Sequence, residues 1–242
     1  KEQAAAGVAQ MAVETTLSQP FHPVTFRNAC VRSGVVEELS GLLSTKESTP
    51  GAKLHALAAL EAIATDDPST DLDNGHALAV CNAGVVPPLV ALLSATEEAL
   101  QVHAASCASV LAENPLCQSK LLQQGVVRPL VLLGTYGNDL ARMHSVAALD
   151  LLVLNNPQAN EMIKAAGGLK LLQGINRYGG SEMRRVAQDV ASAVDTPAET
   201  LAVAVDAKAH ATQAHEARMK HSKILGSAMG VRRAYAPGQR PD

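Results

Sequence analysis

Four short glycine-containing phrases recur along this chain at a nearly constant spacing. Each is followed by an apolar segment and then by a second segment in which apolar residues recur at helical spacing. A period of about 40 residues with helical periodicity inside each unit is typical of an α-solenoid, because one unit cannot bury its own apolar face and stacked neighbours complete the core. The pattern therefore predicts a binding or scaffolding surface. The phrases begin at Gly34, Gly84, Gly125 and Gly167, with steps of 50, 41 and 42 residues between them.

The composition favours an all-α protein. Hydrophobic residues make up 47% of the chain, but aromatic residues make up only 2% and tryptophan is absent. A core of small aliphatic side chains suits close-packed helices better than a β-sandwich. Cys30, Cys81, Cys107 and Cys117 form no CxxC pair and stand among apolar residues, so we expect reduced core thiols and an intracellular compartment.

Charge is distributed unevenly along the chain. Residues 1–217 carry 14 Lys and Arg against 22 Asp and Glu, whereas residues 218–242 carry six basic residues and one acidic residue. We therefore expect an acidic body and a basic terminus. No apolar run reaches membrane-spanning length, so we expect no transmembrane segment. The chain begins with Lys1 and not with Met, which leaves two compartments open: the cytoplasm or cytoskeleton, cilia included, or an organelle after removal of a presequence.

Each unit carries the signals for a short helix, a second helix and a longer third helix. Asn74, Asn114 and Asn156 stand about ten residues before three of the glycines, and each is followed by Gly or Pro. Asn caps free amides at a helix start, and Pro fits the first helical position. The glycine that follows supplies a left-handed residue at the reversal between two helices. The second helix then carries prolines in its first turn, where they are tolerated: Pro87, Pro88 and Pro129.

The three-helix unit of about 42 residues resembles the armadillo repeat. The phrases that begin at Gly84 (GVVPPLVALLS) and Gly125 (GVVRPLVLL) are similar to the second-helix signature of that family. The resemblance covers about residues 23–194 and implies a right-handed α-solenoid of about four repeats. Their approximate limits are 23–66, 74–113, 114–155 and 156–194. A related HEAT-repeat array and a non-repetitive helical bundle are the alternatives.

The resemblance also implies where partners bind. In armadillo folds the third helices line a concave surface, and the family's peptide-binding members place Trp and Asn there, roughly 22 and 26 residues after the glycine. Here these two columns hold small or apolar residues and one Asp, so nuclear-signal recognition in the manner of importin alpha is not expected. A smooth groove of this kind suits an amphipathic helix or a packed subunit. The columns are Ala58, Ser106, Ala147 and Asp189, then Ala62, Val110, Leu151 and Ala193.

Three histidines stand one helical turn before these columns. They are His55, His103 and His144, and the fourth unit has Val186 instead. One interpretation is a polar seam that contacts a docked helix, or a pH-sensitive surface. The interpretation that we favour is partly exposed structural histidines. Stacked repeats lie about 10 Å apart, so these imidazoles cannot share a metal ion.

The two ends of the chain lie outside the repeats. Residues 1–22 are expected to form an N-terminal cap helix and a linker. Residues 195–225 are expected to form a long C-terminal helix, because residues 198–225 contain neither Pro nor Gly, and residues 226–242 to form a basic extended tail. We expect this terminus to contact protein first and nucleic acid second, since it offers one aromatic ring for stacking. The expected contacts are Arg218, Lys220, Lys223, Arg232, Arg233, Tyr235 and Arg240.

The sequence predicts no catalytic, cofactor or metal site. A Gly-rich phosphate loop, HExxH and Gly-x-Ser-x-Gly are all absent from it. We therefore predict a non-catalytic scaffold or structural subunit of a larger multiprotein complex, with protein subunits as partners and no homo-oligomer. The first alternative is a freestanding adaptor that binds a helix or peptide in the concave groove. The second is an accessory subunit of a ribonucleoprotein.

Overall fold

The computed structural model describes residues 3–8, 23–65, 75–154 and 156–195, and in these ranges it contains helices and no strand. Each unit consists of two shorter helices followed by a helix of 15 residues. Residues 3–8 form a further short helical segment. The helices are α2 (Pro23–Arg32), α3 (Val35–Ser44), α4 (Pro50–Ala64), α5 (His76–Asn82), α6 (Val86–Leu92), α7 (Glu98–Ala112), α8 (Pro115–Gln123), α9 (Val127–Tyr136), α10 (Asp139–Val153), α11 (Pro157–Ala165), α12 (Gly168–Tyr178) and α13 (Ser181–Asp195).

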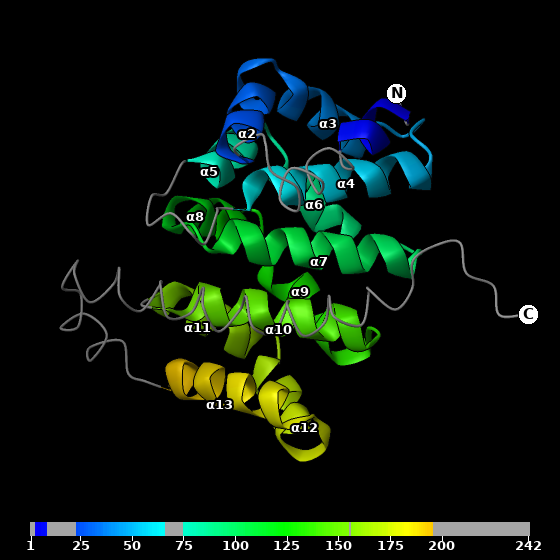
Figure 1. Cartoon of the computed structure of the whole chain (residues 1–242). Coiled ribbons are helices and arrows are strands. Elements are labelled where there is room, and N and C mark those ends of the chain that lie inside the picture. The colour runs from blue at the N-terminus through cyan, green and yellow to red at the C-terminus, as the bar shows by residue number, and fades with distance from the viewer. Residues whose placement is uncertain (1–2, 9–22, 66–74, 155, 196–242) are drawn as a thin grey trace, which may run out of the picture.

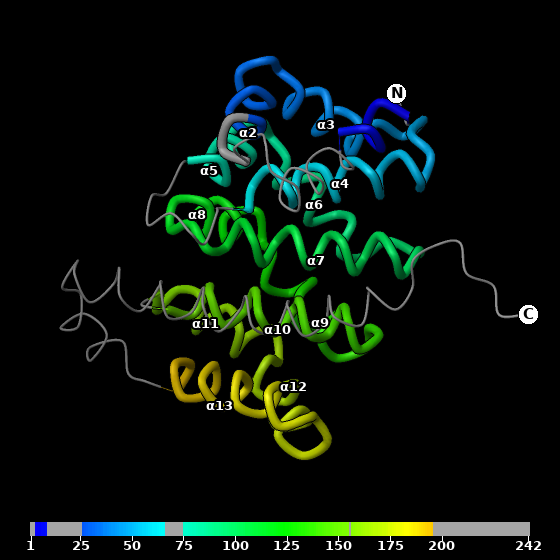
Figure 2. Tube along the Cα trace, viewed as in Figure 1, coloured from blue at the N-terminus to red at the C-terminus, as the bar shows by residue number. Residues whose placement is uncertain are grey.

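The long third helices are stacked in chain order along the molecule (Figures 1 and 2). α4 packs on α7, α7 on α10, and α10 on α13. The first helices follow the same rule, with α2 on α5 and α5 on α8, and among the second helices α3 packs on α6 and α9 on α12. Because each unit contacts its neighbours through equivalent helices, the protein is an α-solenoid. The predicted all-α solenoid is thus confirmed.

The four repeated glycines have the backbone conformation that the sequence predicts for them. Gly34, Gly84, Gly125 and Gly167 have φ angles of 76°, 80°, 72° and 83°. This left-handed region is costly for a residue with a Cβ atom, so glycine is required at the sharp reversal between the first and second helix of each unit. The repeated glycine phrase in the sequence therefore corresponds to a turn between the first and second helix that every unit needs.

The predicted Asn caps are also present wherever the structure describes them. The Asn114 side chain accepts hydrogen bonds from the amides of Leu116 (3.0 Å) and Cys117 (3.4 Å). The Asn156 side chain accepts one from the amide of Ala159 at 3.2 Å. Each cap pairs amides that the first turn of a helix leaves without an intrahelical acceptor. These bonds set the start of α8 and α11.

Side chains from the first helices tie the units together. The Gln118 amide nitrogen on α8 donates to the carbonyl oxygens of Ala112 (2.8 Å) and Leu151 (3.1 Å), in the last turns of α7 and α10. One repeat later, the Asn160 amide nitrogen on α11 donates to the Ala193 carbonyl oxygen of α13 at 2.8 Å. The last carbonyls of a helix lack intrahelical donors, so these bonds pair them while joining neighbouring helices.

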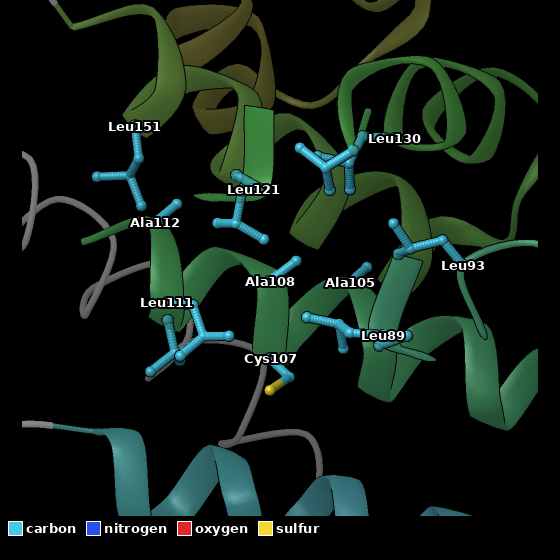
Figure 3. Close-up of a cluster of buried hydrophobic side chains, with 14 of the residues drawn as sticks. Leu89, Leu93, Ala105, Cys107, Ala108, Leu111, Ala112, Leu121, Leu130 and Leu151 are labelled. Atoms are coloured by element: carbon cyan, nitrogen blue, oxygen red, sulfur yellow. The ribbon is translucent and has the colours of Figure 1, made fainter. Parts of the chain in front are cut away.

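One apolar cluster runs through all the units. Figure 3 shows its middle, where Leu111 of α7, Leu121 of α8 and Leu130 of α9 lie around the small residues of α7. Small side chains on α7 allow its neighbours to approach closely, which explains why a core almost without aromatic residues packs well. The four cysteines are free and buried, as the sequence predicts. Burial, with Glu61 nearby, raises the pKa of the Cys107 thiol, so it stays protonated.

Several expectations lie outside the described residues. These are the N-terminal cap helix and linker of residues 1–22 apart from residues 3–8, the long C-terminal helix of residues 195–225 beyond Asp195, the basic extended tail of residues 226–242, and all the basic-tail contacts from Arg218 to Arg240. The helical residues 3–8 border a shallow cavity whose other side is formed by α3. Within the described ranges, every helix is too short or too polar to cross a lipid bilayer.

Candidate functional site

The structure divides the predicted groove residues into exposed, half-buried and buried groups. All of them lie on the stacked third helices α4, α7, α10 and α13. Asp189 is exposed, and Ala58, Ala62 and Ala193 are half-buried. In the two middle units the columns are buried, and Figure 3 shows Leu151 turned toward Ala112 in the core between α10 and α7. The buried residues are Ser106, Val110, Ala147 and Leu151.

The three predicted histidines do not share one environment. His55 and His103 are half-buried, as expected for structural histidines at a surface. The expectation is wrong for His144, which is only 4% exposed. His144 lies on α10 in a stretch of residues that are all buried, and its charge is close enough to act on the carboxylate of Glu61. His103 and His144 therefore face a common acidic group that the sequence reasoning missed.

Glu61 of α4 is the centre of a polar cluster with Ser106 and His103 of α7, and the charge of His144 on α10 also acts on it. Its side chain on α4 is 18% exposed, and the Ser106 hydroxyl of α7 donates a 2.7 Å hydrogen bond to Oε1. The Nδ1 atom of His103, also on α7, lies 3.7 Å from Oε2. The sequence did contain a signal, since Glu61 is the one charged residue in an otherwise apolar run of α4, residues 54–64 apart from His55.

Opposing effects act on the pKa of Glu61. Burial removes water from the carboxylate and by itself raises the pKa. The adjacent His103 side chain and the Ser106 hydrogen bond, with electrostatic attraction from His103 and His144, act in the other direction and prevail, so the pKa of Glu61 is lowered from 4.5. The ionised carboxylate therefore stabilises the fold, because it favours the folded state over an unfolded chain in which these partners are lost.

Stability should depend on pH through this carboxylate. Because the folded-state pKa is lowered, the contribution of Glu61 is complete above the unfolded value of 4.5 and is lost as pH falls through the folded value. We expect Glu61→Gln to cost about 1–3 kcal/mol of unfolding free energy at pH 7, as for other buried charged hydrogen-bonding groups. The difference in unfolding free energy between the native and Glu61→Gln chains should become smaller as pH is lowered from 6 toward 3. This range crosses the usual carboxyl pKa of about 4.

The measurement is urea unfolding of both chains, followed by helical circular dichroism, across that pH range. Glu161→Gln is the matched control, because Glu161 is 74% exposed and forms a surface pair with Lys164 at 3.0 Å. Such exposed pairs contribute little, so the control should follow the native chain within about 0.5 kcal/mol. If the difference in unfolding free energy between the native and Glu61→Gln chains were the same at every pH, the ionised Glu61 carboxylate would not be the stabilising group.

A second surface lies at the turns between the second and third helices of the last two units. Tyr136 is the last residue of α9 and Tyr178 the last residue of α12, and their side chains are 82% and 83% exposed. Each is followed by a glycine whose amide donates to the helix, Gly137 to Leu133 O at 2.8 Å and Gly179 to Ile175 O at 2.7 Å. A Cβ atom on Gly137 or Gly179 would meet that same carbonyl oxygen at 2.5 or 2.6 Å, so glycine is required at both turns, whereas the tyrosine before it is exposed.

Arginine side chains brace the same turns. The Arg142 guanidinium donates to the carbonyl oxygens of Gly134 (3.1 Å) and Gly137 (3.2 Å), and the Arg184 guanidinium donates to that of Gly179 at 2.7 Å. Arg177 lies 6.0 Å from the centre of the Tyr178 ring. The two tyrosines thus project from rigid turns, and a rigid aromatic side chain loses little conformational entropy on binding.

An open cleft of about 530 Å³ lies between these two turns. Thr135 and Asp139 line it from the third unit, and Lys170, Tyr178 and Met183 line it from the fourth. Leu132 and Leu140, four residues before and after Tyr136 in the sequence, are also exposed. We call Leu132, Tyr136, Leu140 and Tyr178 the tyrosine edge. The sequence reasoning missed it, although Tyr-Gly recurs after 42 residues, the same step that separates Gly125 from Gly167.

The comparisons with known proteins support the repeat fold. The family model described as Armadillo/beta-catenin-like repeat matches residues 73–113. The chain is similar to Vacuolar protein 8 of Candida albicans, with 28% identity over 98 residues, which is 40% of this chain but only 17% of that relative's length.

Solved structures extend the likeness to most of the chain. A designed armadillo repeat protein in complex with the peptide (KR)4 has 22% identity and a TM-score of 0.66, covering 80% of this chain and 75% of the other. The armadillo repeats only protein of Plasmodium falciparum has 15% identity and a TM-score of 0.65, covering 80% and 79%. At these identities the structural likeness concerns the fold.

Proposed function

Because this chain is an armadillo-repeat protein, a fold that generally serves as a non-catalytic binding scaffold, we propose that it is a structural subunit of a larger multiprotein complex. The observation that carries the proposal is the tyrosine edge. Its two aromatic side chains are more than four-fifths exposed, and exposed aromatic side chains beside a cleft are candidates for burial by a partner.

The tyrosine edge has the features of a binding hot spot. Tyrosine is enriched among the residues that dominate interface energies, and such residues cluster beside pockets that a partner side chain fills. Tyr136 and Tyr178 occupy equivalent positions on adjacent units, and the cleft between their turns can accept such a side chain. We infer that a partner protein packs across both units here, with the arginines of the turns at the rim.

The basic terminus gives the complex a second point of attachment in this proposal. Arg218, Lys220, Lys223, Arg232, Arg233 and Arg240 would pair with acidic side chains of a partner protein, with Tyr235 among them. Protein is the first choice of partner, and nucleic-acid phosphate is the second. We propose that the complex is located either in the cytoplasm or cytoskeleton, or in an organelle.

One further observation favours the alternative function, a freestanding adaptor that binds a peptide in the groove. Asp150 of α10, Asp189 of α13 and Glu113, which follows the end of α7, are acidic, and the designed neighbour was solved with the basic peptide (KR)4. An acidic groove attracts a basic segment. In this alternative the bound segment would belong to another protein.

Site-specific photo-cross-linking tests the structural-subunit proposal. A photoreactive phenylalanine analogue is placed in the native full chain at Tyr136, at Tyr178 or at the exposed control position Ser119 of α8, and cross-linked products are identified by mass spectrometry. We expect Tyr136 and Tyr178 to cross-link to the same protein, and Ser119 to give none of that product. Different proteins at the two tyrosines, or the same product at Ser119, would count against a single partner on this edge.

A further inference from the structure

The second helices of the last two units carry positive charge that the described part of the chain does not offset. α9 and α12 pack on each other and contain no acidic residue, although the chain has a net charge of -3. Their three basic side chains, Arg128, Lys170 and Arg177, are all exposed. Within the described residues none of the three pairs with a carboxylate, whereas Lys164 of α11 and Arg185 of α13 each pair with a glutamate. We call these three residues the basic patch.

Two residues of the basic patch stand where a cation is unfavourable for the fold. Arg128 is the second residue of α9 and Lys170 the third residue of α12, and each follows the repeat glycine of its unit by three positions. The start of a helix carries partial positive charge, so carboxylates are preferred there and cations are not. The first unit follows this preference, with Glu37 and Glu38 in the first turn of α3. Residues that break such a preference are expected at functional positions.

A glycine inside α12 leaves an unfilled space beside Lys170. Beyond its own helical turn, a Cβ atom on Gly174 would meet no atom of the described residues within 4 Å, so packing within the chain does not require glycine there. Glycine in a helix interior is costly because its backbone loses more freedom on folding. The equivalent residue of α9 is Leu132, which is 47% exposed, so this position of the repeat accepts a large side chain. Gly174 therefore weakens α12 and widens the surface in front of it.

The space in front of Gly174 belongs to the open cleft of about 530 Å³. Lys170, Gly174 and Tyr178 are spaced by four residues, so they follow one side of α12 over about 12 Å. All three line the cleft, together with apolar side chains of α12 and α13. Asp139 is the one carboxylate among the described residues that line it, and Arg142 pairs with this carboxylate at 2.9 Å. The cleft thus combines an apolar lining and an aromatic ring with the unpaired ammonium group of Lys170.

We propose that the partner protein docks here through an acidic segment, with carboxylates on the basic patch and a large apolar side chain in the cleft in front of Gly174. The inference rests on the proposed function, because it names the chemistry of the partner at the tyrosine edge. Complementary charge directs an acidic segment to this surface and disfavours basic ones. Nucleic acid suits the surface less well, since three cations neutralise few phosphates and the cleft has an apolar lining.

Selection of random dodecapeptides displayed on phage tests this chemistry with a defined set of probes. Peptides that bind the native full chain are kept, and those that also bind the Gly174→Leu chain are removed in each round. Because Leu132 occupies the equivalent position of α9, the Gly174→Leu chain should keep the repeat fold, which circular dichroism checks. We expect the remaining peptides to combine Asp or Glu with a large apolar residue at least about threefold more often than the unselected library.

Fluorescence anisotropy of the best remaining peptide then measures the part played by each feature. Lys170→Glu should weaken its binding at least about tenfold, because the change places like charges opposite each other. Lys46→Glu is the matched control, since Lys46 is an exposed lysine of the first unit and the change in net charge is the same. Gly41→Leu is the control for Gly174→Leu, because Gly41 is the equivalent residue of α3 and a Cβ atom there also meets nothing within 4 Å among the described residues. Both control chains should bind the peptide within about twofold of the native chain.

The outcomes separate this inference from the proposed function. Peptides that lack Asp and Glu, or that bind the Lys170→Glu chain as tightly as the native chain, would overturn the acidic segment; if Tyr136→Ser with Tyr178→Ser still weakens them, the tyrosine edge stands. Peptides that bind this double Ser chain as tightly as the native chain would count against both. A selection that leaves no peptide after removal on Gly174→Leu would mean that the cleft accepts no side chain. Tighter binding of a thymidine oligonucleotide than of any peptide, lost with Lys170→Glu, would assign the basic patch to nucleic acid.

Discussion

Replacing Leu149 by Ala should remove about 2–5 kcal/mol from the free energy of unfolding, the range found when a large buried side chain is deleted and a cavity remains. Leu149 has no exposed surface and belongs to α10, which packs on α7, α9 and α13. Because these helices belong to three different units, the cavity would open where the units share their interior. The cost should therefore lie at the upper end of the range, since neighbouring units cannot collapse into the space without shifting the stack.

Urea unfolding followed by helical circular dichroism measures this loss, and amide exchange shows where it occurs. In a solenoid each unit is stabilised mainly by its neighbours. Exchange should therefore accelerate in α7, α9 and α13 more than in the distant α2. The control is Leu116→Ala on α8, a leucine that is 61% exposed, which should change stability by less than about 0.5 kcal/mol. Equal losses from the two leucines would refute a shared interior at α10.

The sequence predicted the repeat and its helix boundaries well because both depend on local chemistry. Glycine at the turn is needed for a left-handed backbone, and Asn114 and Asn156 pair amides within their own first turns. Such requirements involve residues only a few positions apart, so they leave a readable pattern. The start of α3 at Val35 follows from the same argument.

The candidate surfaces were harder to predict because they depend on packing between units. Glu61 and Ser106 are 45 residues apart in the sequence, and nothing local to either residue indicates that α4 and α7 bring them within 2.7 Å. The histidine column was found, but the burial of His144 was not, because it depends on how α10 packs against the helices of neighbouring units. Tyr136 and Tyr178 recur at the repeat spacing, but that recurrence is explained by the glycine turn that follows each of them, and nothing in the sequence shows that the rings are exposed.

The exposed rings at Tyr136 and Tyr178 should carry most of the affinity for the partner that cross-linking identifies. Truncating a central interface tyrosine commonly costs at least about 2 kcal/mol, so Tyr136→Ser with Tyr178→Ser should weaken binding by roughly 10²–10³-fold or more. The loss should appear mainly in the dissociation rate, because the change removes short-range contacts and leaves the charges in place. Surface plasmon resonance with the purified partner and the full chain measures both rates.

Two controls separate binding from folding in this experiment. Both side chains are more than 80% exposed, so the double variant should unfold at the same urea concentration as the native chain, within about 0.5 kcal/mol. Tyr136→Phe with Tyr178→Phe keeps the rings and removes the hydroxyl groups. If binding depends on burial of the rings, the double Phe variant should bind the partner within about tenfold of the native affinity. If the hydroxyl groups form hydrogen bonds across the interface, each lost bond would cost about 1 kcal/mol of binding free energy. A double Ser variant that binds as tightly as the native chain would exclude the tyrosine edge as the principal contact.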